Sequence, residues 1–259
     1  MSTLHHFTPG NFEFLEGGFP YSQGVIASPG FELVRVRLAS APTIAAGFER
    51  IAQHLESIGR PLTALCAIEL RSPRPFSFSG FHDFNVGYVN TLTQWGLVRN
   101  GLNPVGRSNV CPVFDAPGEP VFHAFCYTVP AELASAQPST SSSTRDFVVA
   151  GSGEWPDGQA FPQAVIARGD LSPAGLAAKV DFVIKTMKGR CAGLGGDWRR
   201  LSAAQIYTAE NFHALLESHF ASAGLTAIGL NWHLCKPPII ELEFEMDVRS
   251  LSCERVLFE

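Results

Sequence analysis

Three polar side chains in the first half of the chain are of types that can bind a small carboxylic acid. Tyr21 lies in GGFPYSQGVIASPG (17–30), a stretch bounded by glycine and proline, and Arg107 follows a proline in NPVGRSNV. Between them stands Asn85, in FHDFNVGY. An arginine donates two parallel hydrogen bonds to a carboxylate, and an amide can orient a carbonyl or a water. Loops on a rigid scaffold often carry such groups.

Each of these residues also has a purely structural interpretation. A bend rich in glycine and proline can serve only its backbone dihedral angles, and Tyr21 could fill a subunit interface. Arg107 could be a surface arginine or part of an interface salt bridge. Asn85 could be a helix-surface or capping amide. The residue types alone leave both interpretations open.

A run of carboxylates stands near the end of the chain. Glu241, Glu243 and Glu245 alternate with apolar residues in IIELEFEM. In a strand, alternation with a period of two places the three carboxylates on one face and the apolar side chains on the other. This can be an ordinary solvated sheet face. Otherwise a cation, a neighbouring subunit or shifted pKa values must relieve the repulsion between the carboxylates.

The elements that must position these groups follow one order in both halves of the chain. After an opening β-hairpin, each half reads β–α–β–α–β–β. Apolar residues at spacings of three and four, together with helix start and stop signals, predict the helices. We expect them at 42–59, 78–96, 172–196 and 209–224. The sequence therefore predicts an α+β fold in which each half is a mixed sheet with two helices on one face.

A segment of different composition separates the two halves. Residues 132–146, ELASAQPSTSSSTRD, are rich in Ser, Thr and Ala and poor in large apolar side chains, which is typical of a linker. We therefore predict a first domain at 1–131 and a second domain at 147–259.

Composition excludes several classes of protein. The 259 residues carry a net charge of −5 and no basic run, which disfavours nucleic-acid binding. No apolar run approaches the ~20 residues that cross a bilayer, and we expect no secretory signal. We therefore expect a cytoplasmic protein that has neither a nucleic acid nor a membrane as its partner.

Cysteines and histidines show no metal-binding or redox spacing. The six cysteines are far apart and form no CxxC, and the eight histidines form no HxH or HxxxH. We expect no metal, no cofactor and no structural disulfide. The neighbours of Cys111 are apolar, which predicts a buried thiol rather than a reactive one.

The polar residues of the first half carry a family pattern. Pro20–Val25 reads Pro-Tyr-x-Gln-Gly-Val, Asn85 lies in Phe-x-x-Phe-Asn-x-x-Tyr, and Arg107 follows a proline-containing loop. Each half thus resembles a domain of the RidA/YjgF (Rid, L-PSP) superfamily, whose fold is similar to that of the trimeric bacterial chorismate mutases. The resemblance covers nearly the whole chain as two tandem copies. It implies either a homotrimer with six domains or a pseudo-symmetric arrangement, and we expect the homotrimer.

The second half departs from this pattern. It has no asparagine or arginine at the matching places, but its strand IIELEFE resembles the acidic ending of the family. The resemblance therefore implies a site divided between the halves, with Tyr21 and Glu243 as catalytic residues. Arg107, Asn85 and Ser152, the last in AGSGEW, are the substrate-binding residues that it implies.

The resemblance also implies an activity. Catalytic members of this superfamily hydrolyse enamines and imines of small amino acids or deaminate 2-aminomuconate-type acids. We therefore expect a deaminase or enamine/imine hydrolase that acts on a small carboxylate-bearing amino compound, similar to 2-aminoacrylate or 2-aminomuconate. The alternative is a noncatalytic protein that binds a small carboxylate or regulates a partner enzyme.

Overall fold

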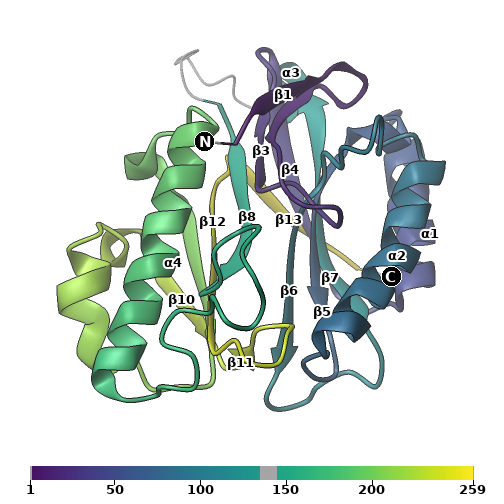
Figure 1. The fold of residues 1–259 in the computed structure, drawn as a ribbon. Helices are drawn as coiled ribbons and strands as arrows, with labels where there is room; N and C mark the ends of the chain where they lie inside the picture. The colour runs from purple at the N-terminus through teal and green to yellow at the C-terminus, as the bar shows by residue number, and fades with distance from the viewer. Residues whose placement is uncertain (1, 135–144, 259) are drawn as a thin grey trace.

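The strands of the chain form two sheets, with helices on their outer faces (Figure 1). The computed structural model describes residues 2–134 and 145–258. The seven-stranded sheet has the order β1 (Leu4–Phe7), β2 (Phe12–Leu15), β3 (Gly24–Ala27), β8 (Phe147–Gly153), β12 (Phe244–Ser250), β9 (Ala203–Thr208) and β10 (Leu230–His233). The six-stranded sheet has the order β11 (Cys235–Lys236), β6 (Gly106–Pro112), β5 (Leu65–Arg71), β7 (Val121–Pro130), β4 (Phe31–Leu38) and β13 (Cys253–Leu257).

Three long helices begin at hydroxyl caps. Thr43, Ser77 and Ser172 each accept a hydrogen bond from a backbone N–H in the first turn. They start α1 (Ile44–Ser57), α2 (Phe78–Gln94) and α4 (Pro173–Gly193), which confirms the first three predicted helices. A short helix, α3 (Ala131–Ala134), follows β7.

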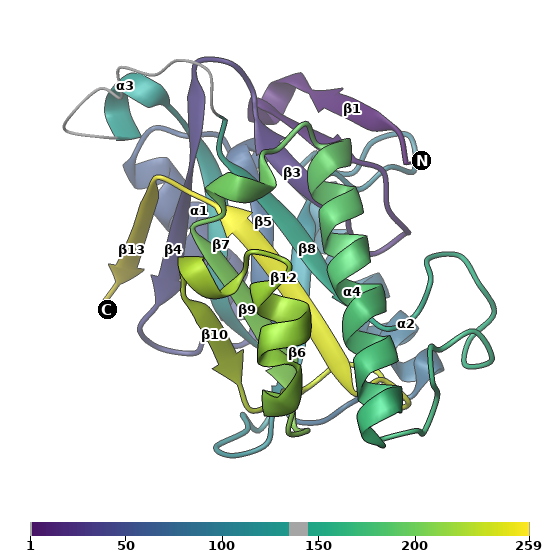
Figure 2. The same ribbon diagram turned by 90° about the vertical axis from the view of Figure 1, so that its left-hand side faces the viewer.

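The fourth predicted helix, at 209–224, is irregular. It consists of a 3₁₀ turn at His213–Leu215 and a π-helix at Leu216–Ala221 (Figure 2). Leu215 and Phe220 both enter the core, although their spacing of five residues does not fit an α-helical period. The wider turn of a π-helix accommodates one more residue per turn than an α-helix. The packing of Leu215 and Phe220 in the core therefore replaces the α-helix that the sequence pattern predicted.

Each sheet has its own apolar core on its outer face. Helix α1 places Phe48, Ile51 and Leu55 against the six-stranded sheet. Helix α4 places Val180, Val183 and Met187 against the seven-stranded sheet. The apolar faces of both sheets therefore point outward to the helices, and polar faces are left to meet between the sheets.

The two halves of the sequence do not form separate sheets. Strand β3, from the first half, pairs with β8, and β13, from the end of the chain, pairs in parallel with β4. Strand β11 likewise joins β6. The chain is a single mixed-sheet domain, so our prediction of two tandem RidA/YjgF-like domains, each with its own sheet, was wrong. Strand partners decided the outcome, and short apolar runs in a sequence do not specify their partners.

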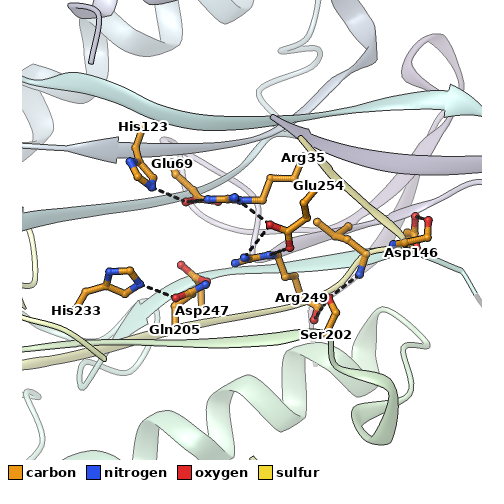
Figure 3. A network of polar contacts seen from close by, with 12 residues as sticks. Arg35, Glu69, His123, Asp146, Ser202, Gln205, His233, Asp247, Arg249 and Glu254 are labelled. Carbon is orange, nitrogen blue, oxygen red and sulfur yellow. Dashed lines mark hydrogen bonds and ion pairs between the residues drawn. The ribbon is translucent and has the colours of Figure 1, made fainter. Parts of the chain in front are cut away.

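Two further expectations depended on that architecture. The homotrimer is not supported, because only the resemblance to the RidA/YjgF superfamily implied it, and the two sheets meet within one chain (Figure 3). Most of the predicted linker, residues 135–144, lies outside the described residues. The boundaries 1–131, 132–146 and 147–259 stay a prediction.

Charged side chains join the two sheets (Figure 3). Arg35 on β4 binds both carboxylate oxygens of Glu69 on β5, at 2.6 and 2.8 Å. Glu254 on β13 accepts hydrogen bonds from Arg35 at 3.0 Å and from Arg249 on β12 at 2.8 Å. One carboxylate thus bridges two buried arginines of different sheets.

The carboxylate run meets this interface only in part. Strand β12 begins at Phe244, so Glu241 and Glu243 precede it, and our prediction of three carboxylates on one strand face was wrong. Glu241 lies in a turn with a φ of 88° and pairs with Arg168 at 2.8 Å. From Phe244 onward the alternation holds: Glu245 and Asp247 face inward, while Met246 and Val248 pack in the core.

No helix within residues 2–134 and 145–258 is long and apolar enough to cross a membrane.

Replacing Glu254 tests the charged contact between the sheets. Glu254→Gln leaves Arg35 and Arg249 without their shared anion, and we expect it to lower the free energy of unfolding by about 1–3 kcal/mol. Urea denaturation monitored by tryptophan fluorescence measures this change. The matched control is Asp197→Asn, because the Asp197–Arg199 pair lies on the surface and is worth little. Equal stability of the two variants would contradict the structural role of Glu254.

Two histidines at the interface predict a pH effect on stability. Burial and Arg71 lower the pKa of His123 to about 3 and that of His233 to about 4. As the pH falls below about 6.5, these histidines bind protons in the unfolded chain before they do so in the folded chain. The stability that the neutral histidines give to the folded state is therefore present above that pH and is lost as the pH falls below it.

We therefore expect wild type to lose more stability than His123→Gln between pH 7 and 5, by up to about 1.4 kcal/mol per pH unit. Buried carboxyl groups whose pKa is raised, such as Glu245, titrate in the opposite sense but are common to both proteins. Denaturation curves at several pH values give the difference. Parallel pH dependences of the two proteins would contradict the prediction.

Candidate active site

A cavity of about 830 Å³ opens between the N-terminal part of α2 and helix α4. Its wall comes from both halves of the chain: the segment 16–23, helix α2, strands β6 and β8, the loop at 155–158, helix α4 and residues 238–245. The volume is within the range of pockets that hold small molecules. Four of the five predicted site residues line it: Tyr21, Asn85, Arg107 and Ser152.

Arg107 is the central charged group of this cavity. Its side chain is 2% exposed, and its Nη1 donates to Oδ1 of Asn85 at 2.7 Å. Its Nε and Nη2 have no hydrogen-bond partner among the described residues. Burial lowers the pKa of Arg107, yet a guanidinium stays charged at neutral pH. The structure therefore holds a buried cation with two unused donors in the wall of a cavity.

Aromatic rings hold this guanidinium in place. Its Cζ atom lies 4.7 Å from the ring centroid of Tyr21 and 4.8 Å from that of Tyr88. Phe81 lies at 5.3 Å. Cation–π contacts stabilise a cation but accept none of its hydrogen bonds. The rings orient Arg107 and leave Nε and Nη2 free for an anion.

The segment that carries Tyr21 is fixed against the loop that leads to Arg107. Ser22 is fully buried, and its hydroxyl donates to the carbonyl of Pro104 at 3.0 Å. Asn103 donates to the carbonyl of Pro20 at 2.8 Å. A Cβ on Gly24 would lie 2.7 Å from the carbonyl oxygen of Val148 on β8, so the close approach of these strands requires glycine. These contacts explain the glycine and serine around Tyr21.

Further hydrogen-bond donors lie near Arg107. Asn109 follows it by two residues on β6, its amide oxygen accepts from Ser72 at 3.0 Å, and its Nδ2 has no partner among the described residues. Ser152 on β8 makes one long hydrogen bond, 3.4 Å, to the carbonyl of Gly153. Both residues line the cavity. Asn109 was not among the predicted site residues, although its place on the same strand face as Arg107 was a usable signal.

Glu245 contributes a buried carboxyl group to the cavity lining, which also includes the less buried Glu16, Asp83 and Asp157. Glu245 is 4% exposed, and it lines the cavity with Arg107 and Tyr21. Burial and the negative charge of Asp247 raise the pKa of Glu245 well above its usual value, against the opposing effect of Arg107. This shift favours the protonated form of the carboxyl group. A Cβ on Gly151 would overlap Oε1 of Glu245, so the glycine makes room for the carboxyl group.

Glu243, the predicted catalytic acid, does not line the cavity. Its backbone N–H donates to Glu154 at 2.7 Å, and the N–H of Phe244 donates to the same carboxylate at 3.1 Å. Glu154 is fully buried and pairs with Lys179 of α4 at 3.1 Å. Glu154 therefore binds the backbone where β12 begins and joins it to α4.

Helix α4 contributes a second buried arginine to the cavity wall, Arg190, which was not among the predicted site residues. It is 6% exposed, and its Nη2 donates to Asp157 at 2.8 Å. A signal was present: Arg190 follows Val183 and Met187 by helical steps and so continues the buried stripe of α4. A charged residue on an apolar helix face is a candidate for a site.

Apolar side chains form the remaining wall. Phe81, Ile239 and Leu242 pack together, with Trp155 and Tyr21 against them. Reciprocal backbone hydrogen bonds, from Phe76 to Pro238 at 2.8 Å and from Ile240 to Phe76 at 2.9 Å, hold the 238–242 loop beside α2. A ligand with anionic groups and an apolar carbon chain matches this combination.

Cys111 and possible metal ligands add no chemistry here. Cys111 is buried, as predicted, and burial raises the pKa of its thiol to about 12. Within the described ranges, no group of three or more His, Cys, Asp or Glu side chains is arranged to hold a metal ion.

Comparison with known proteins identifies the family. The model of the family described as "2-aminomuconate deaminase CnbZ" matches residues 4–255. A curated relative, the 2-amino-5-chloromuconate deaminase of Comamonas testosteroni, is 43% identical over 252 residues, which are 97% of this chain and 98% of that protein. The chain belongs to the CnbZ family.

The fold of this CnbZ chain is similar to that of a chorismatase. The crystal structure of that enzyme has a TM-score of 0.50 and 12% sequence identity, and the match covers 88% of this chain and 77% of the other. These findings overturn our assignment to the RidA/YjgF superfamily. The motifs around Tyr21, Asn85 and Arg107 lie in the wall of one cavity of a chorismatase-like fold.

The protonation of Glu245 in this CnbZ chain can be observed directly. With glutamate labelled by ¹³C at the carboxyl carbon, we expect one resonance with the shift of a protonated acid at pH 7, and we expect Glu245→Gln to remove it. Glu243→Gln is the matched control, and it should leave the resonance in place. If every labelled carboxyl group is ionised at pH 7, the assignment of Glu245 as an acid fails.

Proposed function

We propose that the protein is a hydrolytic deaminase of 2-aminomuconate-like acids. The observation that carries the proposal is the pairing, in one cavity, of a buried arginine with two unused donors and a buried glutamic acid. Family membership supports the choice of substrate, because the family description and the curated relative both name aminomuconates. Among the predicted substrates, the 2-aminomuconate type is favoured over the 2-aminoacrylate type.

The reaction consumes one water and releases one ammonia. A 2-aminomuconate is an enamine, and a proton added to a carbon of its diene converts it to an iminium. Water adds to the carbon that carries the nitrogen, and the nitrogen accepts a proton. The C–N bond then breaks as the new hydroxyl group gives up its proton, ammonia leaves, and a ketone remains. Each step needs a positioned proton donor or acceptor and a fixed carboxylate beside the reacting carbon.

The residues of the cavity match these needs. In our proposal Arg107 binds the carboxylate next to the amino-bearing carbon through Nε and Nη2, and Asn85 orients the guanidinium. Tyr21 donates a hydrogen bond to the water or the nitrogen. Asn109 and Ser152 supply further donors to the carboxylate. Every donor is held by contacts that exist without substrate, so little reorganisation is needed on binding.

We assign the proton transfers to Glu245, in place of Glu243. Glu245 lines the cavity and its pKa is raised, so it can donate a proton to the enamine and then return as a base for the attacking water. Because the protonated form starts the reaction, kcat/KM should fall as the pH rises through the pKa of Glu245. Glu243 lies outside the lining of the cavity.

Ammonia release from 2-aminomuconate and 2-amino-5-chloromuconate tests the proposal. We expect Glu245→Gln to lower kcat at least about 100-fold, the usual contribution of a general acid. Arg107→Ala should abolish activity. Glu243→Gln should keep wild-type activity and serves as the matched control, since it removes a carboxylate two residues away.

Two results would contradict this assignment. Loss of activity in Glu243→Gln with full activity in Glu245→Gln would return the acid to Glu243. No ammonia from any aminomuconate, combined with binding of simple carboxylates that requires Arg107, would indicate a noncatalytic binding protein.

A further inference from the structure

The cavity holds a second arginine that the proposed chemistry does not use. Arg107 reaches the cavity from β6 of the six-stranded sheet, and Arg190 reaches it from α4, on the outer face of the seven-stranded sheet (Figure 1). Arg190 is buried, with only 6% of its surface exposed. Burial of a second cation in the same wall is costly unless an anion compensates it.

The partners of Arg190 leave part of its guanidinium unused. Nη1 makes long contacts with the carbonyls of Ala150 and Gly151, at 3.3 and 3.4 Å. Nη2 donates to Asp157 at 2.8 Å, and Nε has no partner among the described residues. The guanidinium is therefore held by two weak carbonyl contacts and one carboxylate, with hydrogen-bonding capacity left over.

Asp157 is an exchangeable partner. Its side chain is 56% exposed, it lies in the loop after β8, and it also accepts a hydrogen bond from Gln23 at 3.1 Å. Gln23 belongs to the segment that carries Tyr21. An exposed carboxylate on a loop can turn to water at little cost, because its hydration replaces the ion pair. The guanidinium of Arg190 is buried, so water cannot replace its carboxylate partner in the same way.

We propose that Arg190 binds the second carboxylate of the substrate, the one far from the amino group, and that this carboxylate displaces Asp157 from Nη2. This inference rests on the proposed function for the identity of the substrate. It adds the residue that selects a dicarboxylic acid over a monocarboxylic acid. Arg107 and Arg190 bind the two ends of a dicarboxylic acid, and Phe81, Ile239 and Leu242 contact the carbon chain between them. A monocarboxylic acid leaves Arg190 paired with Asp157 and loses one of the two ion pairs.

Binding of unreactive acids tests this without turnover. Trans,trans-muconate and sorbate share a six-carbon diene and differ in the second carboxylate, and isothermal titration calorimetry measures both. We expect wild type to bind muconate about 10- to 100-fold more tightly than sorbate, the range for one charge-assisted contact. Arg190→Gln should remove that preference and leave the sorbate affinity unchanged. Arg107→Gln should weaken both ligands.

Two further variants sharpen the test. Arg190→Lys keeps the positive charge but lacks the planar guanidinium, so we expect a preference for muconate over sorbate between those of wild type and Arg190→Gln. This variant keeps the test valid if Arg190→Gln folds poorly. Asp157→Asn removes the competing carboxylate and should tighten muconate about 3- to 10-fold without changing sorbate. Arg168→Gln, which alters an exposed arginine that does not line the cavity, is the matched control and should change neither affinity.

The outcomes separate this inference from the proposed function. Equal affinities of wild type for muconate and sorbate, or a muconate preference that survives in Arg190→Gln, would overturn the role of Arg190. Weaker muconate binding in Asp157→Asn would overturn the displacement, because Asp157 would then position Arg190. An Arg190-dependent preference for muconate with no ammonia release would uphold the second carboxylate site and overturn the deaminase proposal.

Discussion

The polar contact between the two sheets is the interaction on which the rest of the structure depends. Helices cover the apolar outer faces, so the inner faces must satisfy buried charges across the gap (Figure 3). Glu254 does so by bridging Arg35 and Arg249. A misplaced sheet would leave charges unpaired, which is more costly than the loss of an apolar contact. The network thus selects one relative position of the sheets, and the cavity lies where their ends and helices meet.

Strand exchange makes the site a property of the whole chain. The N-terminal hairpin is part of the sheet that contains β12, and the last strand returns to the sheet that contains β6. Tyr21, Arg107 and Glu245 come from three distant segments, yet each is held by backbone pairing within a sheet or by buried hydrogen bonds. Elements that are rigid before ligand binds can present a buried cation and a neutral acid at little entropic cost on binding.

Burial governs the chemistry of two ionisable side chains in the cavity wall, Glu245 and Arg107. Loss of water favours the neutral form of Glu245, while a guanidinium cannot lose its charge and so gains from an incoming anion. In our proposal the same environment therefore produces both a proton donor and an anion site. The buried pair of Glu154 and Lys179 lies next to the cavity wall, because Glu154 accepts the backbone N–H groups of Glu243 and Phe244 where β12 begins. Polar groups that never touch the ligand determine its surroundings.

The sequence by itself determined the three long helices, most strands and four of the residues in the cavity wall, because periodicity, caps and short motifs are local signals. It could not determine which strands pair, since an apolar strand of five residues fits many partners, and so the tandem architecture was wrong. It named Glu243, whereas the cavity lining includes Glu245, because the side chains that line a cavity depend on segments that pack together only in the folded chain. Arg190 became a site residue only when α4 packed beside the loop of Asp157. Helices and short motifs depend on residues that are close in the sequence. Strand pairing, burial and shifted pKa values depend on segments that meet only in the folded chain.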